Sequence, residues 1–172
     1  LLPRRSKPTP EVSLSSEGTY LITGGLGALG LHVARWLVSK GARHLVLTSR
    51  RGITTPGAKE AAGALERQGA NVEIVSADIS CEVDIERLFA QINASMPPLR
   101  GVVHAAGVDA LVPLTTMTAD ELGSMMAPKM EGGWLLHERT RDMNLDMFVC
   151  FSSITSVWGS AGRAHYGAAN AF

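Results

Sequence analysis

Thr23-Gly24-Gly25-Leu26-Gly27-Ala28-Leu29-Gly30 joins a short β-branched and aromatic run, residues 18–23, to an amphipathic segment. The apolar residues of that segment recur at helical spacing and predict one stripe on a helix over 29–40: Leu29, Val33, Trp36 and Leu37. Glycines at a strand-to-helix turn let the backbone approach a ligand closely, and the free N–H groups of the first helical turn favour a phosphate. The stretch therefore predicts a dinucleotide pyrophosphate site, while a glycine trio alone also fits a simple tight turn.

The composition limits the class of protein. With 172 residues, 45% hydrophobic and 19% charged, the chain fits one domain or most of one. Sixteen basic residues balance sixteen acidic ones, so neither nucleic acid nor an anionic membrane is indicated as a partner. No apolar run approaches a membrane span, and the N-terminus lacks an apolar signal core, so we expect a soluble, cytoplasmic protein. Cys81 and Cys150 have no metal-ligand spacing, so we expect reduced structural thiols and no metal.

Strand and helix patterns alternate along the chain after a Pro- and Ser-rich segment. Residues 1–17 read as a linker or an edge segment. The expected strands are 20–23, 44–48, 71–76, 99–104 and 147–152, and the expected helices are 29–40, 56–68, 81–95 and a long region over 118–141. Alternation of this kind predicts right-handed βαβ units and an α/β fold with a doubly wound parallel sheet. The chain stops at Phe172 inside a further helix pattern, so residues 18–172 are expected to be a C-terminally incomplete domain.

Local signals support several of these boundaries. Thr55-Pro56 predicts an N-cap followed by proline at N1, and Gly69 is placed to end the same helix. Thr118-Ala-Asp-Glu121 has the capping-box pattern. Pro128 is expected to kink the 118–141 region just before Lys129. The helix over 81–95 has a stripe predicted to be buried: Ile85, Leu88, Phe89 and Ile92.

The end of the second strand predicts the choice of cofactor. An NAD-binding fold would place an acidic residue there, whereas this chain has Ser49, Arg50 and Arg51. Guanidinium groups pair with a 2′-phosphate and the serine adds a hydrogen bond, so the pattern favours NADPH over a merely solvated basic turn. Asp78, followed by Ile79 after the third strand, either accepts from the adenine amino group or caps a helix.

Polar residues also follow the fourth and fifth strands. The small residues Ala105, Ala106 and Gly107 suit a backbone close to the cofactor, and His104 is expected to be a hydrogen-bonded packing residue. Tyr166 and Asn170 share one helix face at i and i+4. A phenol with a pKa near 10 exchanges protons at neutral pH only beside a cation, and Lys129 is the candidate cation.

These residues resemble the short-chain dehydrogenase/reductase superfamily, with its Rossmann-like fold, and more closely the ketoreductase domains of modular polyketide synthases. The resemblance covers residues 18–172 and rests on five groups of residues: the glycine stretch, residues 48–52, His104-Ala-Ala-Gly107, Phe151-Ser-Ser153 with Lys129, and residues 165–172. Most of the superfamily has lysine four residues after the tyrosine, where this chain has Asn170. In the polyketide ketoreductases the lysine and asparagine are exchanged between two helices, and Lys129 fills the exchanged position.

The resemblance implies a reaction and its residues. Hydride from NADPH would reduce the β-carbonyl of a ketoacyl thioester that an acyl carrier protein presents on phosphopantetheine, within a synthase that carries other domains in cis. Tyr166 would donate the proton, Ser153 would hydrogen-bond the same oxygen, Lys129 would lower the tyrosine pKa and hold the nicotinamide ribose, and Asn170 would orient the relay. Ser152 remains an alternative to Ser153, but the spacing of thirteen residues to Tyr166 matches the family at Ser153. The cofactor contacts implied are Thr23, Gly24, Gly25, Leu26, Gly27, Leu29, Gly30, Ser49, Arg50, Arg51, Asp78, Ile79, Ala105, Ala106, Gly107, Lys129 and Tyr166.

The resemblance also suggests a stereochemical type. One facial type carries Leu-Asp-Asp after the fourth strand, whereas this chain reads Val108-Asp-Ala-Leu111. The other type carries a tryptophan eight residues before the tyrosine, and Trp158 stands there. This favours the A-type and an L-configured β-hydroxyl, with ordinary packing as the alternative role of Trp158. Arg163, rather than histidine, lies three residues before Tyr166, so the subtype that selects an epimerised α-substituent is not supported.

Three other readings fit parts of the pattern. A non-catalytic Rossmann subdomain that braces a synthase would be free to lose the tyrosine, serine, lysine or glycines, and all are present. A nucleotide-sugar epimerase or dehydratase also uses glycines at the spacing of Gly24, Gly27 and Gly30, but keeps lysine four residues after its tyrosine. A stand-alone fatty-acid-type carrier-protein reductase would also have lysine at the position of Asn170, so the sequence argues against this reading as well.

Overall fold

The computed structural model describes residues 14–172, which form one five-stranded parallel sheet with helices on both faces. The strand order is β3-β2-β1-β4-β5. The strands are β1 (Thr19–Thr23), β2 (His44–Ser49), β3 (Asn71–Ser76), β4 (Leu99–His104) and β5 (Met147–Cys150). The helices are α1 (Ala28–Ser39), η1 (Gly52–Thr54), α2 (Ala58–Glu66), α3 (Glu82–Ser95), α4 (Ala119–Met126), α5 (Met130–Thr140), α6 (Thr155–Trp158) and α7 (Ala164–Ala171). The prediction of a doubly wound parallel sheet is confirmed. The expectation for residues 1–13 of the linker lies outside the described residues.

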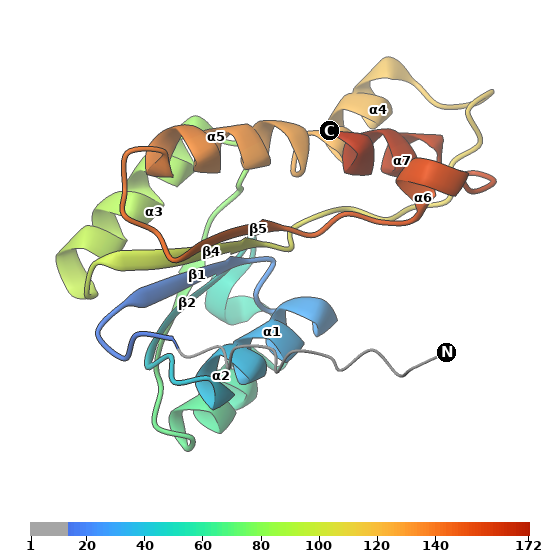
Figure 1. The fold of residues 1–172 in the computed structure, drawn as a ribbon. Coiled ribbons are helices and arrows are strands. Elements are labelled where there is room, and N and C mark those ends of the chain that lie inside the picture. Colours follow the sequence, from blue (N-terminus) through green and yellow to red (C-terminus); the bar gives the residue numbers. More distant parts are fainter. Residues whose placement is uncertain (1–13) are drawn as a thin grey trace, which may run out of the picture.

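The alternation of side chains along the strands builds two apolar layers. Figure 1 shows α1 and α2 on one face of the sheet and α3 and α5 on the other. Tyr20 and Ile22 of β1 point into the layer under α1, while Leu21 between them packs with the buried stripe of α3. All three side chains are fully buried. Because both faces are covered, all five residues of β1 are buried, instead of alternating between buried and exposed positions.

The two apolar layers do not cover the carboxyl ends of the strands, so functional side chains can lie there. Helices α4, α6 and α7 gather at that end of the molecule, beyond the carboxyl ends of β4 and β5 (Figure 1). Strand β5 forms the edge of the sheet, and three of its four residues are exposed. The functional side chains predicted from the sequence lie at this carboxyl end.

The stripe predicted for α1 is partly wrong. The buried residues of α1 are Gly30, Ala34, Leu37 and Val38. Leu29 and Trp36 are instead 47% and 43% exposed. Val33 and Trp36 face an apolar groove that also includes Val149 and Phe151, on the uncovered side of β5. Glycine and alanine replace the larger residues under the helix because α1 lies close to the sheet at the glycine loop.

Two of the predicted helix boundaries need correction, and others hold. Helix α2 begins at Ala58 after Gly57, whose φ is +77°, so Thr55-Pro56 is not its N-cap and N1; the Thr55 hydroxyl instead bonds Ser49 Oγ at 2.9 Å. The long region over 118–141 is two helices, α4 and α5, because Pro128 interrupts it. The capping box of Thr118 and Glu121 is present. Gly69 ends the turn after α2 with φ +87°.

The cysteines are both free, as expected, but neither belongs to the buried core. Cys81 precedes α3 on the surface, and Cys150 ends the edge strand beside the cavity described below. Among the described residues, no group of three metal-ligating side chains is present. No helix in the described part of the chain is long and apolar enough to cross a membrane.

Candidate functional site

The glycine loop crosses the carboxyl ends of β1, β2 and β4 with almost no space for side chains. Gly25 N–H donates to the Thr48 carbonyl at 3.0 Å, and Gly27 N–H donates to the Gly24 carbonyl at 3.0 Å. Gly24 has φ +64°, and a Cβ there would lie 2.9 Å from the backbone of Ala106. These contacts require glycine for two separate reasons, the left-handed backbone and the close approach of a neighbouring strand.

The loop delivers an open helix N-terminus. Helix α1 starts after Gly27, which provides no side-chain cap, so the N–H groups of its first turn have no side-chain partner there. Such groups bind phosphate well because the helix end carries a partial positive charge. The cradle and the uncapped helix therefore fit a dinucleotide pyrophosphate.

Two adjoining hollows flank the loop and share Ser49, Arg50 and Gly107. One is closed on its far side by Asp78 and Ile79, and the other is open toward Arg51. Both arginines are exposed, and no ion pair of theirs is recorded among the described residues. Two arginines at the end of β2, with no acidic residue at that position, fit a phosphorylated adenosine ribose better than a plain one.

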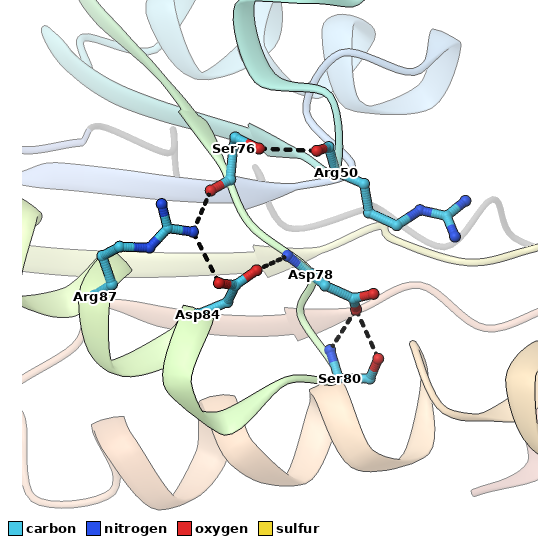
Figure 2. Close-up of polar contacts among 6 residues, drawn as sticks. All are labelled: Arg50, Ser76, Asp78, Ser80, Asp84 and Arg87. Atoms are coloured by element: carbon cyan, nitrogen blue, oxygen red, sulfur yellow. Dashed lines mark hydrogen bonds and ion pairs between the residues drawn. The ribbon is translucent and has the colours of Figure 1, made fainter.

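Asp78 forms a local turn and is not the N-cap of α3, one of the two roles that the sequence left open. Figure 2 shows one of its carboxylate oxygens turned toward Ser80. Asp78 Oδ1 accepts from the Ser80 backbone N–H at 3.0 Å and from Ser80 Oγ at 2.6 Å. The residue therefore fixes the turn before α3, whose N-cap is Cys81. Because Asp78 also lines the hollow beside Arg50, it remains available to a ligand there.

His104 is a buried link between β4 and β1. Its Nδ1 lies 2.6 Å from Thr23 Oγ1, and the side chain is 2% exposed. Burial, with a smaller contribution from the charge of Lys129, lowers the pKa of His104 to about 4. The imidazole is therefore neutral at physiological pH, which agrees with the packing role expected from the sequence.

Lys129 reaches the sheet edge between β4 and β5. It immediately precedes α5, after the interruption at Pro128, and its Nζ donates to the Phe151 carbonyl at 2.6 Å. A Cβ on Gly107 would lie 3.0 Å from Lys129 Cε, so the glycine leaves space for the lysine stem. Burial lowers the pKa of Lys129.

The residues after β5 include a hydrogen-bonded contact with the C-terminal end of α7. Ser152 Oγ donates to the Asn170 carbonyl at 2.6 Å, and Asn170 Nδ2 donates to the Tyr166 carbonyl at 2.7 Å. Ser153 Oγ accepts from the Thr155 N–H at 3.3 Å. The Ser152 hydroxyl is thus committed to the backbone of α7, whereas the Ser153 hydroxyl lies in the turn that opens α6.

One cavity of about 540 Å³ brings several of these groups together. Its lining includes His104, Lys129, Ser152 and Asn170. The Tyr166 side chain is half-buried on α7, and no hydrogen bond joins its hydroxyl to Lys129 or Ser153 in the described part of the chain. The Asn170 Oδ1 atom is buried without a hydrogen-bond partner among the described residues.

Some contacts of the site had no signal in the sequence. Arg163 Nε lies 3.1 Å from Asp109 Oδ1, and Val112 N–H donates to the Gly162 carbonyl at 2.9 Å. These contacts join the loop after β4 to the turn before α7. Trp158, at the end of α6, is 80% exposed. Partners fifty or more residues apart in the chain follow no local pattern, so only the fold reveals them.

Comparison with known proteins agrees with this geometry. Residues 18–172 match the family described as KR domain. The chain is 44% identical to the phenolphthiocerol synthesis polyketide synthase type I Pks15/1 of Mycobacterium bovis, over 91% of this chain and 8% of that protein. It is also 44% identical, over 91% of its length, to a Pks1 of Mycobacterium tuberculosis whose name calls its activity into question. The chain thus spans about a tenth of the length of these curated relatives.

Solved structures show the same arrangement of elements. The ketoreductase of the first module of phoslactomycin biosynthesis in Streptomyces sp. HK803 superimposes with a TM-score of 0.86 at 42% identity, over 96% of this chain and 38% of that one. An A-type ketoreductase from a modular polyketide synthase gives 0.85 at 42% identity, over 98% and 34%. From the family match and the shared sheet, this chain belongs to the ketoreductase (KR) domain family of modular polyketide synthases.

Proposed function

We propose that this protein reduces a β-ketoacyl thioester to the β-hydroxyacyl thioester with NADPH, while an acyl carrier protein presents the substrate on phosphopantetheine. The observation that carries the proposal is that Lys129, immediately before α5, and Asn170, on α7, line one cavity. That arrangement separates the chain from reductases and epimerases that keep lysine four residues after the tyrosine, where this chain has Asn170. The acyl carrier protein and the neighbouring synthase domains are part of the proposal.

The residues of the described structure fit the cofactor. The glycine loop and the uncapped start of α1 would hold the pyrophosphate, while Ser49, Arg50 and Arg51 would hold the 2′-phosphate. Asp78 would contact the adenine beside Ile79. When bound, NADPH supplies the hydride of the reduction.

The protein itself would supply the proton of the reduction and control its transfer to the substrate oxygen. Tyr166 would donate a proton to the oxygen of the reduced carbonyl, as a general acid. Lys129, which lines the same cavity as Asn170, would supply the positive charge that assists this proton transfer. Ser153 would hydrogen-bond the same oxygen, and the free Oδ1 of Asn170 would orient the proton relay.

The stereochemical part of the proposal rests on Trp158 and on the relatives. Trp158 is exposed at the carboxyl end of α6, where a substrate chain can contact it. The solved A-type ketoreductase shares 42% identity with this chain. We therefore propose an A-type product with an L-configured β-hydroxyl. Chiral analysis of the product tests this, and a D-configured alcohol would contradict it.

The central test is Tyr166→Phe in the intact protein that contains these residues, with a β-ketoacyl pantetheine thioester as substrate. NADPH oxidation should fall by at least about 100-fold, because general acid catalysis contributes about that much or more. NADPH binding, measured by fluorescence titration, should be unchanged, and NADH is run beside it. Unchanged turnover with intact NADPH binding would refute the role of Tyr166.

A non-catalytic role is the second candidate, and the name of the Pks1 relative favours keeping it. In that case the domain would brace a synthase without reducing a ketone. Tight NADPH binding by the wild-type protein without any ketone reduction would support this role over the catalytic one.

A further inference from the structure

A network of three side chains lies behind the expected cofactor site, on β3 and α3. Asp84 Oδ2 accepts from the Asp78 backbone N–H at 2.8 Å, and Asp84 Oδ1 accepts from Arg87 Nη2 at 2.8 Å. The same Arg87 nitrogen donates to the Ser76 carbonyl at 2.9 Å. Figure 2 shows how these contacts surround the turn that leads from β3 to Asp78.

The other arm of the network reaches the arginine turn. Ser76 Oγ donates to the Arg50 carbonyl at 2.8 Å. The turn also presses against the same serine, since a Cβ on Gly52 would lie 2.9 Å from Ser76 Cβ. The Arg50 side chain points away from the network in Figure 2, so the guanidinium stays free while its backbone is held.

We propose that Ser76, Asp84 and Arg87 are positioning residues that set the distance between Arg50 and Asp78, and so tune recognition of the phosphorylated adenosine end of the cofactor. Ser76 holds the backbone that carries Arg50, and Asp84 holds the backbone of Asp78. None of the three reaches the hollows themselves. The inference rests on the proposed use of NADPH.

The physical role of the network is geometric rather than a gain in stability. The Arg87 side chain is 56% exposed, so its ion pair with Asp84 contributes little to folding. The hydrogen bond from Asp78 N–H is the main cause that lowers the pKa of Asp84, so the carboxylate stays charged at neutral pH. Asp84 therefore keeps one oxygen on the turn while its other oxygen binds Arg87.

The two arms predict different binding signatures. Ser76→Ala releases the arginine backbone, so the Kd for NADPH should rise about fivefold while the Kd for NADH stays the same, because only NADPH has the 2′-phosphate. Asp84→Ala releases the Asp78 turn, so both Kd values should rise by about tenfold, which corresponds to about 1.4 kcal/mol. At saturating NADPH, kcat should stay near the wild-type value for both variants.

Glu86→Gln is the matched control. Glu86 also lies on α3 and forms an ion pair with Arg139 at 2.5 Å, but it does not contact the β3 turn. This variant should bind both cofactors like the wild type. Thermal unfolding of all variants separates a loss of fold from a loss of positioning, since the three substitutions should shift Tm by similar small amounts.

A double-mutant cycle with Arg50→Ala isolates the Ser76 arm. If Ser76 acts through the position of the Arg50 side chain, Ser76→Ala should have no further effect on the NADPH Kd once that side chain is removed. Equal effects in both backgrounds, or Ser76→Ala and Asp84→Ala proteins that bind NADPH as the wild type does, would overturn the proposal. A wild-type protein that binds NADPH without reducing the ketone contradicts the catalytic proposal alone, because the binding data still decide the role of the network.

Discussion

Replacing Gly30 with alanine sets two effects against each other. Gly30 lies in the first turn of α1, and alanine within a helix is favoured over glycine by about 1 kcal/mol. A Cβ on Gly30, however, would lie 2.4 Å from the Gly24 carbonyl oxygen and 2.6 Å from Gly25 Cα. The sign of the effect depends on whether these atoms can move away.

The neighbours of Gly30 cannot move cheaply, because both belong to the backbone of the loop. Cβ atoms essentially never come closer than 3.0 Å to other atoms, so a gap of 2.4 Å must widen considerably. The loop is fixed by the bonds from Gly27 to Gly24 and from Gly25 to Thr48. Forced overpacking costs about 1–3 kcal/mol, and two backbone contacts place this site at the upper end. After the gain in helix propensity, we expect Gly30→Ala to lower the free energy of unfolding by about 2 kcal/mol.

Gly63→Ala in α2 is the control with the opposite sign. The nearest atom to a Cβ there is Arg67 Nη1 at 3.5 Å, which is ordinary contact with a flexible side chain. The same substitution should therefore raise the free energy of unfolding by up to about 1 kcal/mol. Urea unfolding followed by circular dichroism measures both variants, and Gly30→Ala should also weaken NADPH binding while Gly63→Ala should not. If Gly30→Ala stabilised the protein as Gly63→Ala does, the close packing of the loop against α1 would be refuted.

Three further predictions concern the carboxyl edge of the sheet. His104 has a pKa of about 4 in the folded protein and an ordinary value of 6.5, so the unfolded state binds more protons between these values and stability should fall by about 3 kcal/mol as pH drops from 6.5 to 4. Urea unfolding across this range should show that loss in the wild type and much less of it in His104→Gln; equal losses would contradict the assignment. Lys129→Met should lower kcat by at least about 100-fold, because the proposed proton transfer from Tyr166 loses the cation that assists it, and a kcat within a few-fold of wild type would exclude that role. Ser153→Ala should reduce turnover more than Ser152→Ala, whose main effect should be a lower Tm because it loses the bond to the Asn170 carbonyl; the reverse order of turnover would assign the substrate contact to Ser152.

The sequence correctly predicted those features that depend only on residues close together in the chain. The break at Pro128 and the capping box at Thr118 each depend on residues within one turn, and both are present. The stripe of α3 was predicted correctly because its buried face packs fully on the sheet. The buried stripe predicted for α1 was partly wrong, because a large part of the apolar face of that helix borders the groove beside β5 instead of the core. The predicted start of α2 was wrong, because the Thr55 hydroxyl bonds Ser49 and does not cap the helix.

For the site, the sequence alone identified the residue types and the family: the glycine spacing, the basic pair Arg50 and Arg51, and the exchange of Lys129 with Asn170. Only the tertiary structure decided which groups meet. The carboxyl ends of parallel strands bring together segments far apart in the chain, so Lys129 reaches the Phe151 carbonyl and His104 reaches Thr23. The network of Ser76, Asp84 and Arg87 behind Arg50 and Asp78 is of the same kind. Residue identity fixes what a side chain can do, but the distance and direction to its partner come from strand order and packing.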